Sequence, residues 1–197
     1  MSFTSAVALL LGVCALPVAA LAQGNAAELG FHYAYNSLAA SNENGASFYG
    51  EYFLKGTSPH LHGQDRLGLI GEFGGSGIAS GSLYTYLAGI RFNTEWKKSH
   101  LVLHSEYKAG GAHARVNGVN SAGANVSFSR NSFALGIAGV GLDLRLGQHY
   151  VLTLLQTDFP AMEVPDAATD ISHWSGDLRV SAGIGYRFGS KPFGSKP

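Results

Sequence analysis

Cysteine is almost absent from this sequence of 197 residues. The single cysteine, Cys14, lies inside an apolar N-terminal run, so a chain that is exported and cleaved after that run contains none. A mature chain without cysteine cannot have a disulfide framework. Its stability must therefore come from packing and backbone hydrogen bonds.

An excess of charge of one sign is also lacking. Lys and Arg together number 13, Asp and Glu together number 13, and the formal net charge is zero. Nucleic-acid binding through counterion release needs a basic stripe, and the sequence contains none. We therefore expect no nucleic acid among the partners.

Long hydrophobic runs and helical periodicity are missing after Gln23. No apolar stretch there reaches the roughly 20 residues that a membrane-spanning helix needs. Glycine, by contrast, is abundant at 27 residues and has no collagen period, whereas its usual share is about 7%. The length that remains corresponds to one domain.

Residues 1–22 have the features of a secretory signal peptide. Their apolar run, 6–22, contains no charged side chain and ends in Ala-Leu-Ala, a small-x-small motif. This motif predicts cleavage between Ala22 and Gln23. An uncleaved membrane anchor is the alternative, but the run contains Pro17 and is shorter than a spanning helix requires.

Alternation with period two recurs along the rest of the chain. In segment 178–188, LRVSAGIGYRF, apolar side chains occupy every second position and Arg, Ser or Gly the others. Strands of about 10 residues with this pattern can cross a bilayer at a tilt of about 45°. The sequence therefore predicts an all-β fold, an eight-stranded antiparallel up-and-down transmembrane β-barrel over residues 23–189. Its other seven strands are expected in segments 28–36, 46–55, 66–73, 83–93, 100–108, 131–144 and 149–159.

Two of these segments are less regular than the others. Segment 149–159 fits either parity. Segment 131–144 is interpreted with small and aliphatic residues on its apolar face, namely Ala134, Gly136, Ala138, Val140 and Leu142.

The connecting segments predict the orientation of the barrel. With the N-terminus in the periplasm, inner turns fall at 56–63, 94–98 and 143–148, and outer loops at 39–45, 75–81, 110–130 and 160–176. Long loops outside and short turns inside are typical of outer-membrane barrels. The last two loops are the expected binding surfaces, and the Gly, Asn, Ser and Ala content of 110–130 predicts mobility.

A water-soluble, lipocalin-like barrel has the same alternation with its faces reversed. Two features favour the membrane. The polar faces hold charged residues that must pair inside a narrow barrel: Arg66, Glu72, Arg91, His104, Glu106, Lys108, Arg179 and Arg187. The apolar faces hold aromatic residues that would form interfacial girdles: Phe31, Phe92, Trp96, Tyr186 and Phe188 on the periplasmic side, and Tyr35, Phe48, Phe73, Tyr84 and Tyr107 on the outer side.

The final strand, LRVSAGIGYRF, resembles the C-terminal strand of small bacterial outer-membrane barrels of the OmpA/OmpX type, and GIAGVGLDLRLGQHYVLTLLQTDF resembles their penultimate region. The resemblance implies outer-membrane lipid and the outer-membrane assembly machinery as partners. It also implies that the machinery reads Tyr186 and Phe188. The chain departs from the family pattern because nine residues follow Phe188. Since Pro192 removes a backbone donor that a strand needs, we expect residues 190–197 to form a short, disordered periplasmic tail.

Two groups of residues invite a catalytic or metal-binding interpretation. His173-Trp174-Ser175 resembles the His-x-Ser pair of barrels that act on lipid A, but a nucleophile also needs a group that orients its base. His60 and His62 with Asp65 are too few for a metal site without supporting residues, and a solvated turn is the expectation. We therefore predict no catalytic, cofactor-binding or metal-binding residues.

The predicted function is that of an integral outer-membrane barrel with a structural or surface-interaction role. Eight strands enclose an interior that side chains fill, so a wide pore is not expected. Three alternatives stay open: a narrow passive channel for small solutes, an outer-leaflet lipid-modifying enzyme, and a soluble lipocalin-like binder. The sequence identifies no surface ligand.

Overall fold

The computed structural model describes residues 26–38, 41–60, 63–78, 81–96, 99–119, 123–165, 172–176 and 178–189. The predicted cleavage site, Ala22 and Gln23, and the predicted tail, 190–197, lie outside these ranges. Within them, no helix is long and apolar enough to cross a membrane.

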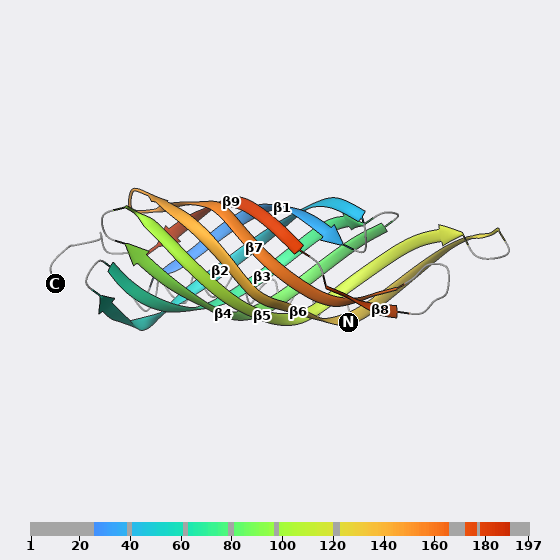
Figure 1. Cartoon of the computed structure of the whole chain (residues 1–197), viewed down its shortest axis with the longest axis horizontal. Helices are drawn as coiled ribbons and strands as arrows, with labels where there is room; N and C mark the ends of the chain where they lie inside the picture. Colours follow the sequence, from blue (N-terminus) through green and yellow to red (C-terminus); the bar gives the residue numbers. More distant parts are fainter. Residues whose placement is uncertain are drawn as a thin grey trace.

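The described chain consists of antiparallel strands joined by short connections (Figure 1). The strands are β1 (Ala27–Leu38), β2 (Ser41–His60), β3 (Gly63–Ile78), β4 (Gly81–Trp96), β5 (Leu101–Val119), β6 (Asn125–Leu146), β7 (Tyr150–Pro165), β8 (Ser172–Gly176) and β9 (Leu178–Phe188).

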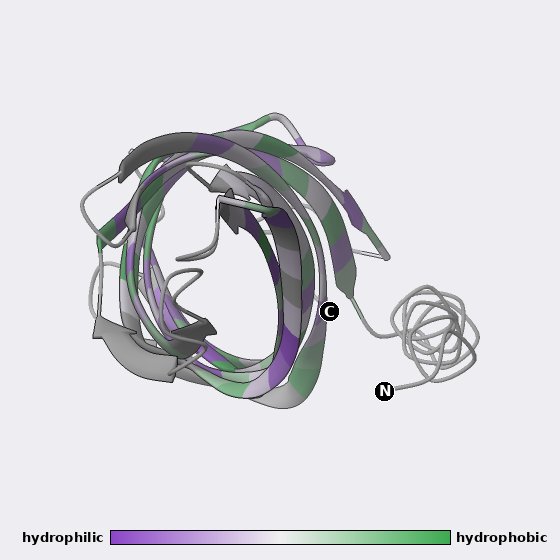
Figure 2. Ribbon diagram, turned by 90° about the vertical axis from the view of Figure 1, so that its right-hand side faces the viewer, coloured by the Kyte–Doolittle hydropathy of each residue, from purple (hydrophilic) through white to green (hydrophobic). Residues whose placement is uncertain are grey.

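The strands close into a ring. Each of β1 to β7 pairs with the next strand along the chain, and β9 pairs with both β7 and β1. The short β8 pairs with the far end of β7, beyond the part that β9 covers. Because only residue 177 separates β8 from β9, the two form one interrupted wall strand. The predicted eight-stranded antiparallel barrel is therefore confirmed, and Figure 2 shows the ring end-on.

The barrel has an apolar outside and a polar inside. In β9, Leu178 and Ile184 have 40% and 52% of their surface exposed, whereas Arg187 in the same strand is 2% exposed. The predicted faces of β1 to β5 follow the same rule, and Figure 2 shows hydrophilic and hydrophobic residues alternating along the strands. This polarity is the opposite of that of a water-soluble barrel, whose apolar side chains point inward.

The predicted face of segment 131–144 is wrong in its first half. Ala134 is buried inside the barrel at 2% exposure, whereas Val140 is 49% exposed on the outside. The pairing of β6 with both neighbours shifts between these residues, near Ile137. Such a bulge adds a residue to one strand, so the side chains beyond it change faces.

The predicted loops are also largely wrong, because strands continue through them. Segment 110–130 is mostly a paired hairpin, in which β5 and β6 stay in register up to Val119 opposite Asn125. β2 covers most of 39–45 and 56–63, and β7 and β8 cover both ends of 160–176. Gly, Ser and Asn have low strand propensity, but an adjacent strand satisfies their backbone groups. The described turn at 147–149 begins at Gly147, whose φ of 71° suits glycine.

Candidate functional site: the charged barrel interior

The predicted interfacial aromatics lie on the outer face. Phe31, Tyr35, Phe48, Tyr84, Phe92 and Tyr107 are exposed, and Phe73 and Trp96 are half-buried. The predicted division into two girdles needs one correction. Phe31 and Phe48 were assigned to opposite girdles, but they are cross-strand partners with ring centroids 5.1 Å apart. They therefore belong to one aromatic group.

The predicted assembly residues lie at the opposite end of the last strand from β8. Phe188 pairs with Ala27 at the start of β1, where the barrel closes. The Tyr186 ring packs between its neighbours, with centroid distances of 4.7 Å to Phe188, 5.3 Å to His149 and 5.4 Å to Tyr150. This end of β9 is thus an aromatic cluster on the outer surface.

Inside the barrel, a first group of charges surrounds Arg179. This guanidinium donates to Asp158 Oδ2 from Nε at 2.8 Å and from a terminal nitrogen at 2.5 Å. It also donates to both oxygens of Glu72, one of them at 3.1 Å. Lys108 contacts Glu72 and Glu106. The side chains come from β3, β5, β7 and β9, so the group joins opposite parts of the wall.

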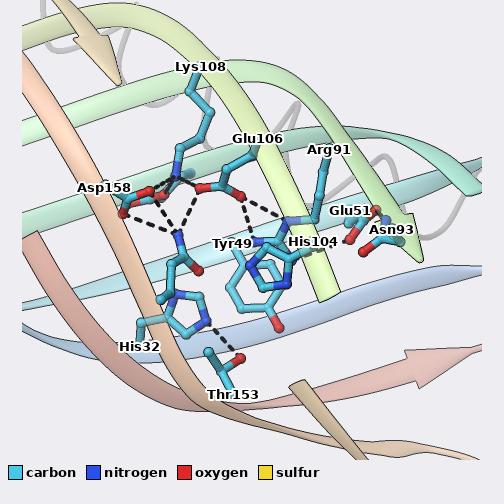
Figure 3. A network of polar contacts seen from close by, with 12 residues as sticks. His32, Tyr49, Glu51, Arg91, Asn93, His104, Glu106, Lys108, Thr153 and Asp158 are labelled. Atoms are coloured by element: carbon cyan, nitrogen blue, oxygen red, sulfur yellow. Dashed lines mark hydrogen bonds and ion pairs between the residues drawn. The ribbon is translucent and has the colours of Figure 1, made fainter. Parts of the chain in front are cut away.

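A second group is centred on Arg91, next to the first. Its guanidinium lies 2.8 Å from Glu106 and 3.4 Å from Glu51. Asn93 donates to Glu51 at 2.7 Å. The Tyr49 ring lies beneath the guanidinium, with its centroid 5.0 Å from Arg91 Cζ. Figure 3 shows that Glu106 connects the Arg91 group to Lys108.

A third group occupies the end of the barrel near Phe188. Arg187 lies between Glu28 and Glu95, at 2.9 Å from each. Arg145 contacts Glu95 at 3.0 Å, and the more exposed Arg66 lies 3.9 Å from the same carboxylate. One carboxylate therefore holds three cations at this end.

The two buried histidines lie between these groups. His104 Nδ1 is 3.1 Å from Asp143, and His32 Nε2 is 3.3 Å from Thr153. Gln156 donates to Glu106 at 2.7 Å and also to Asp158. These contacts extend the network across the barrel.

The side chains of the three groups fill this part of the barrel. Their positive and negative charges are nearly equal in number. The Tyr49 ring lies directly against Gly30 and close to Gly185, where even a Cβ atom would collide with it. Among the described residues, every inward cation contacts a carboxylate, and every inward carboxylate except Asp143 contacts a cation, as buried charges require. Asp143 contacts His104 instead. Inward carboxylates are Glu28, Glu51, Glu72, Glu95, Glu106, Asp143 and Asp158, and the cations are Arg66, Arg91, Lys108, Arg145, Arg179 and Arg187. The arrangement is a plug and leaves no wide water-filled path through this part of the barrel.

Seven of the eight residues predicted for the interior network lie in these groups, and the eighth, His104, is buried between them beside Asp143. The structure adds carboxylates that the sequence reasoning did not include. Glu28 and Glu51 stood on the polar faces of their segments, so alternation alone could have identified them. Glu95 and Asp143 were placed in turns, and Asp158 lay in the segment of uncertain parity.

The other candidate groups lie partly or wholly outside the described side chains. The backbone of His173-Trp174-Ser175 belongs to β8, but the structure does not describe these side chains. The structure also does not describe the side chains of His60 and His62. Among the residues it does describe, no three His, Cys, Asp or Glu side chains form a metal-binding group.

No known family model matches the sequence, and no curated protein matches it. Similar solved structures include Ail, the attachment invasion locus protein of Yersinia pestis, in complex with the heparin analogue sucrose octasulfate, at 18% identity and TM-score 0.45, covering 83% of this chain and 97% of that one. Neisserial surface protein A has 14% identity and TM-score 0.48, with coverage of 84% and 97%. The outer-membrane enzyme PagL has 11% identity and TM-score 0.41, with coverage of 80% and 97%.

The assignment of the fold follows from the barrel's own geometry. A closed ring gives every wall strand a hydrogen-bonded neighbour on both sides over the part of the barrel where the strands overlap, as hydrocarbon requires. Its outer face carries exposed large apolar and aromatic side chains, while its charges are buried inside. A closed eight-stranded wall, an apolar outer face and a charged interior give the chain the architecture of an eight-stranded antiparallel transmembrane β-barrel.

Proposed function

We propose that the chain is a non-enzymatic outer-membrane barrel with a structural or surface-interaction role. The observation that carries this proposal is the plug: Arg91, Lys108 and Arg179 each join carboxylates from other strands across the interior. A filled interior argues against the narrow-channel alternative, and the exposed apolar face argues against a soluble binder.

The hairpin of β5 and β6 is the proposed interaction surface. In the described part of the chain, β6 pairs with β7 only from Ala134 onward, whereas its first residues, 125–131, pair with β5. An exposed strand edge offers backbone donors and acceptors to an extended segment of another protein. Arg115 and Arg130 are exposed on this hairpin. No acidic residue occurs between Glu106 and Asp143.

Conductance tests this proposal against the channel alternative. Purified, folded protein is added to a planar lipid bilayer, and the current is recorded at fixed voltage. We expect no discrete openings, because the plug closes the barrel. Regular single-channel steps that depend on the protein would contradict the proposed role.

Lipid analysis tests the non-enzymatic part. The acylation pattern of lipid A is determined in three sets of cells: cells that express the chain, cells that express the Ser175→Ala variant, and cells that express neither. We expect the same acylation pattern in all three. A pattern that changes with the chain and reverts with Ser175→Ala would show that the barrel is an enzyme.

Assembly is proposed to depend on the end of β9. Phe188→Ala removes a ring from the aromatic cluster where β9 meets β1. We therefore expect less folded protein in the outer membrane, by about fivefold if a terminal signal worth about 1 kcal/mol is lost. Deletion of 190–197 is the matched control and should leave the folded fraction unchanged. Quantitative blotting of heated and unheated membrane fractions measures both. The reverse result would mean that the signal lies in the tail.

A further inference from the structure

The outer face of the barrel carries an open groove toward the end of the wall opposite Phe188. Two exposed tyrosines, Tyr33 on β1 and Tyr84 on β4, lie at its sides. Ala46 on β2 and Gly75 on β3 form its floor, because they lie in register between the two tyrosines. The groove therefore results from two small residues at positions where the neighbouring strands carry rings.

The size and lining of the groove suit an apolar chain. Its volume is about 440 Å³, within the roughly 300–1,000 Å³ of small-molecule sites. No charged side chain lines it, and its polar residues Asn44, Ser76 and Ser82 lie toward the outer ends of their strands. Because this face of the barrel contacts lipid, an acyl chain is the apolar group that reaches the groove.

The outer face becomes polar just beyond the groove. On β4, the outward position after Tyr84 toward the outer end is Ser82, and on β6 the outward positions beyond Phe133 are Asn131 and Ser129. Aromatic residues border the hydrocarbon in outer-membrane barrels. We therefore place the level of the lipid headgroups at these polar positions.

Arg115 lies at this polar level, beside the groove. It pairs across the strands with Ser82, which lines the groove, and its side chain is exposed. Its Nε donates to Ser127 Oγ at 3.1 Å, and among the described residues no carboxylate contacts its guanidinium. Unlike the cations of the plug, Arg115 thus has no anion of its own within the described chain.

His113 lies on the same face, two residues before Arg115. It pairs with Tyr84 at the side of the groove, and its Nδ1 is 2.7 Å from Asn131 Oδ1. An imidazole and a guanidinium can both donate hydrogen bonds to a phosphate. The polar level beside the groove therefore offers donors of the kind that bind an anion.

We propose that the groove and Arg115 together form a binding site for one phosphorylated lipid of the outer leaflet. An acyl chain lies between Tyr33 and Tyr84, and the phosphate accepts hydrogen bonds from the guanidinium, whose planar fork matches phosphate oxygens. The site uses the outer face of the hairpin of β5 and β6 and not its edge. It therefore goes beyond the proposed surface role and does not depend on it.

Native mass spectrometry of the folded barrel in a non-ionic detergent tests the class of ligand. The probe is phosphatidic acid, which has two acyl chains and a phosphate. Diacylglycerol with the same chains lacks the phosphate, and glycerol 3-phosphate lacks the chains. We expect one phosphatidic acid to bind saturably and at least about tenfold more tightly than either of the other two. Equal binding of diacylglycerol, or binding without saturation, would mean unspecific partitioning and would overturn the proposal, as would equal binding of glycerol 3-phosphate.

Two arginine variants test the phosphate contact. Arg115→Gln removes the proposed cation. Arg130→Gln is the matched control, because Arg130 is exposed on the same hairpin but pairs with Ala114, whose side chain lies on the opposite face. We expect Arg115→Gln to weaken phosphatidic acid binding at least about tenfold and Arg130→Gln to change it by less than about twofold. Equal effects would mean that the lipid is attracted to the charge of the hairpin as a whole, which would contradict the site.

Two alanine variants test the acyl-chain contact. Ala46→Leu adds bulk to the floor of the groove, whereas Ala88→Leu adds the same bulk to an exposed outer position on β4 that does not line it. Heat-modifiable gel mobility confirms that each variant folds. Ala46→Leu should weaken phosphatidic acid binding at least about tenfold, and Ala88→Leu should leave it within about twofold of the unmodified chain. Unchanged binding in folded Ala46→Leu would show that no chain occupies the groove.

Discussion

Glu72→Ala is expected to lower the free energy of unfolding of the barrel by about 3–5 kcal/mol, the usual cost of breaking a buried ion pair from one side. Glu72 is 1% exposed and contacts both Lys108 and Arg179. Without it, two buried cations share the remaining carboxylates. Urea titration of the protein in phospholipid vesicles, followed by tryptophan fluorescence, measures the change.

Two further variants make this experiment specific for charge. Glu72→Gln keeps the size of the side chain but not its charge, so it should also destabilise the barrel. In the double variant Glu72→Ala, Arg179→Ala, one cation and one anion leave together, and Lys108 keeps Glu106 and Asp158. The double variant should therefore be more stable than the sum of the two single changes predicts, by about 0.5–3 kcal/mol. Additive changes would mean that the pair is not coupled.

The barrel and most of its two faces could be predicted from the sequence. Each wall strand has lipid on one side and a crowded interior on the other, so the environment of a side chain changes at every residue. That alternation is regular in β1 to β5 and β9, where charges such as Arg91 and Arg187 fall on the polar face. It could be recognised without any knowledge of which strands are neighbours.

The irregular strands could not be predicted in this way. In β7, Leu154 and Leu155 are adjacent in sequence, yet both are exposed, at 44% and 49%. The pairing of β7 shifts at this point against both β6 and β9. A bulge of this kind depends on the registers of both neighbouring strands, which the pattern within a single segment does not reveal. Parity therefore holds only within each half of the strand.

The partners within the plug were also beyond the sequence. Arg179 and Glu72 are 107 positions apart, and their contact depends on how the ring closes. Alternation shows that both side chains face inward, but not that they lie at the same height. For the same reason, the sequence could not show that small residues on β2 and β3, such as Gly45 and Gly74, lie around one space with the larger Leu87 on β4 and Met162 on β7.

Leu69→Arg is expected to lower the free energy of unfolding in lipid by about 2–4 kcal/mol, the cost of a cation at the middle of a barrel's lipid-facing surface. Leu69 lies near the middle of β3, with 41% of its surface exposed, and its outward partner Ile90 on β4 is also exposed. In water, an Arg at such an exposed position would change stability by only about 0.5 kcal/mol. The size of the effect therefore reports what the outer face contacts.

Leu146→Arg is the matched control for depth. Leu146 has similar exposure, 46%, but it ends β6 beside the turn at Gly147. An Arg near the membrane surface reaches the headgroups, so the expected cost falls to about 0–1 kcal/mol. Urea titrations of both variants in vesicles of the same lipid give the comparison. Equal and small changes at the two positions would mean that Leu69 faces water, and the membrane-spanning interpretation of the barrel would have to be abandoned.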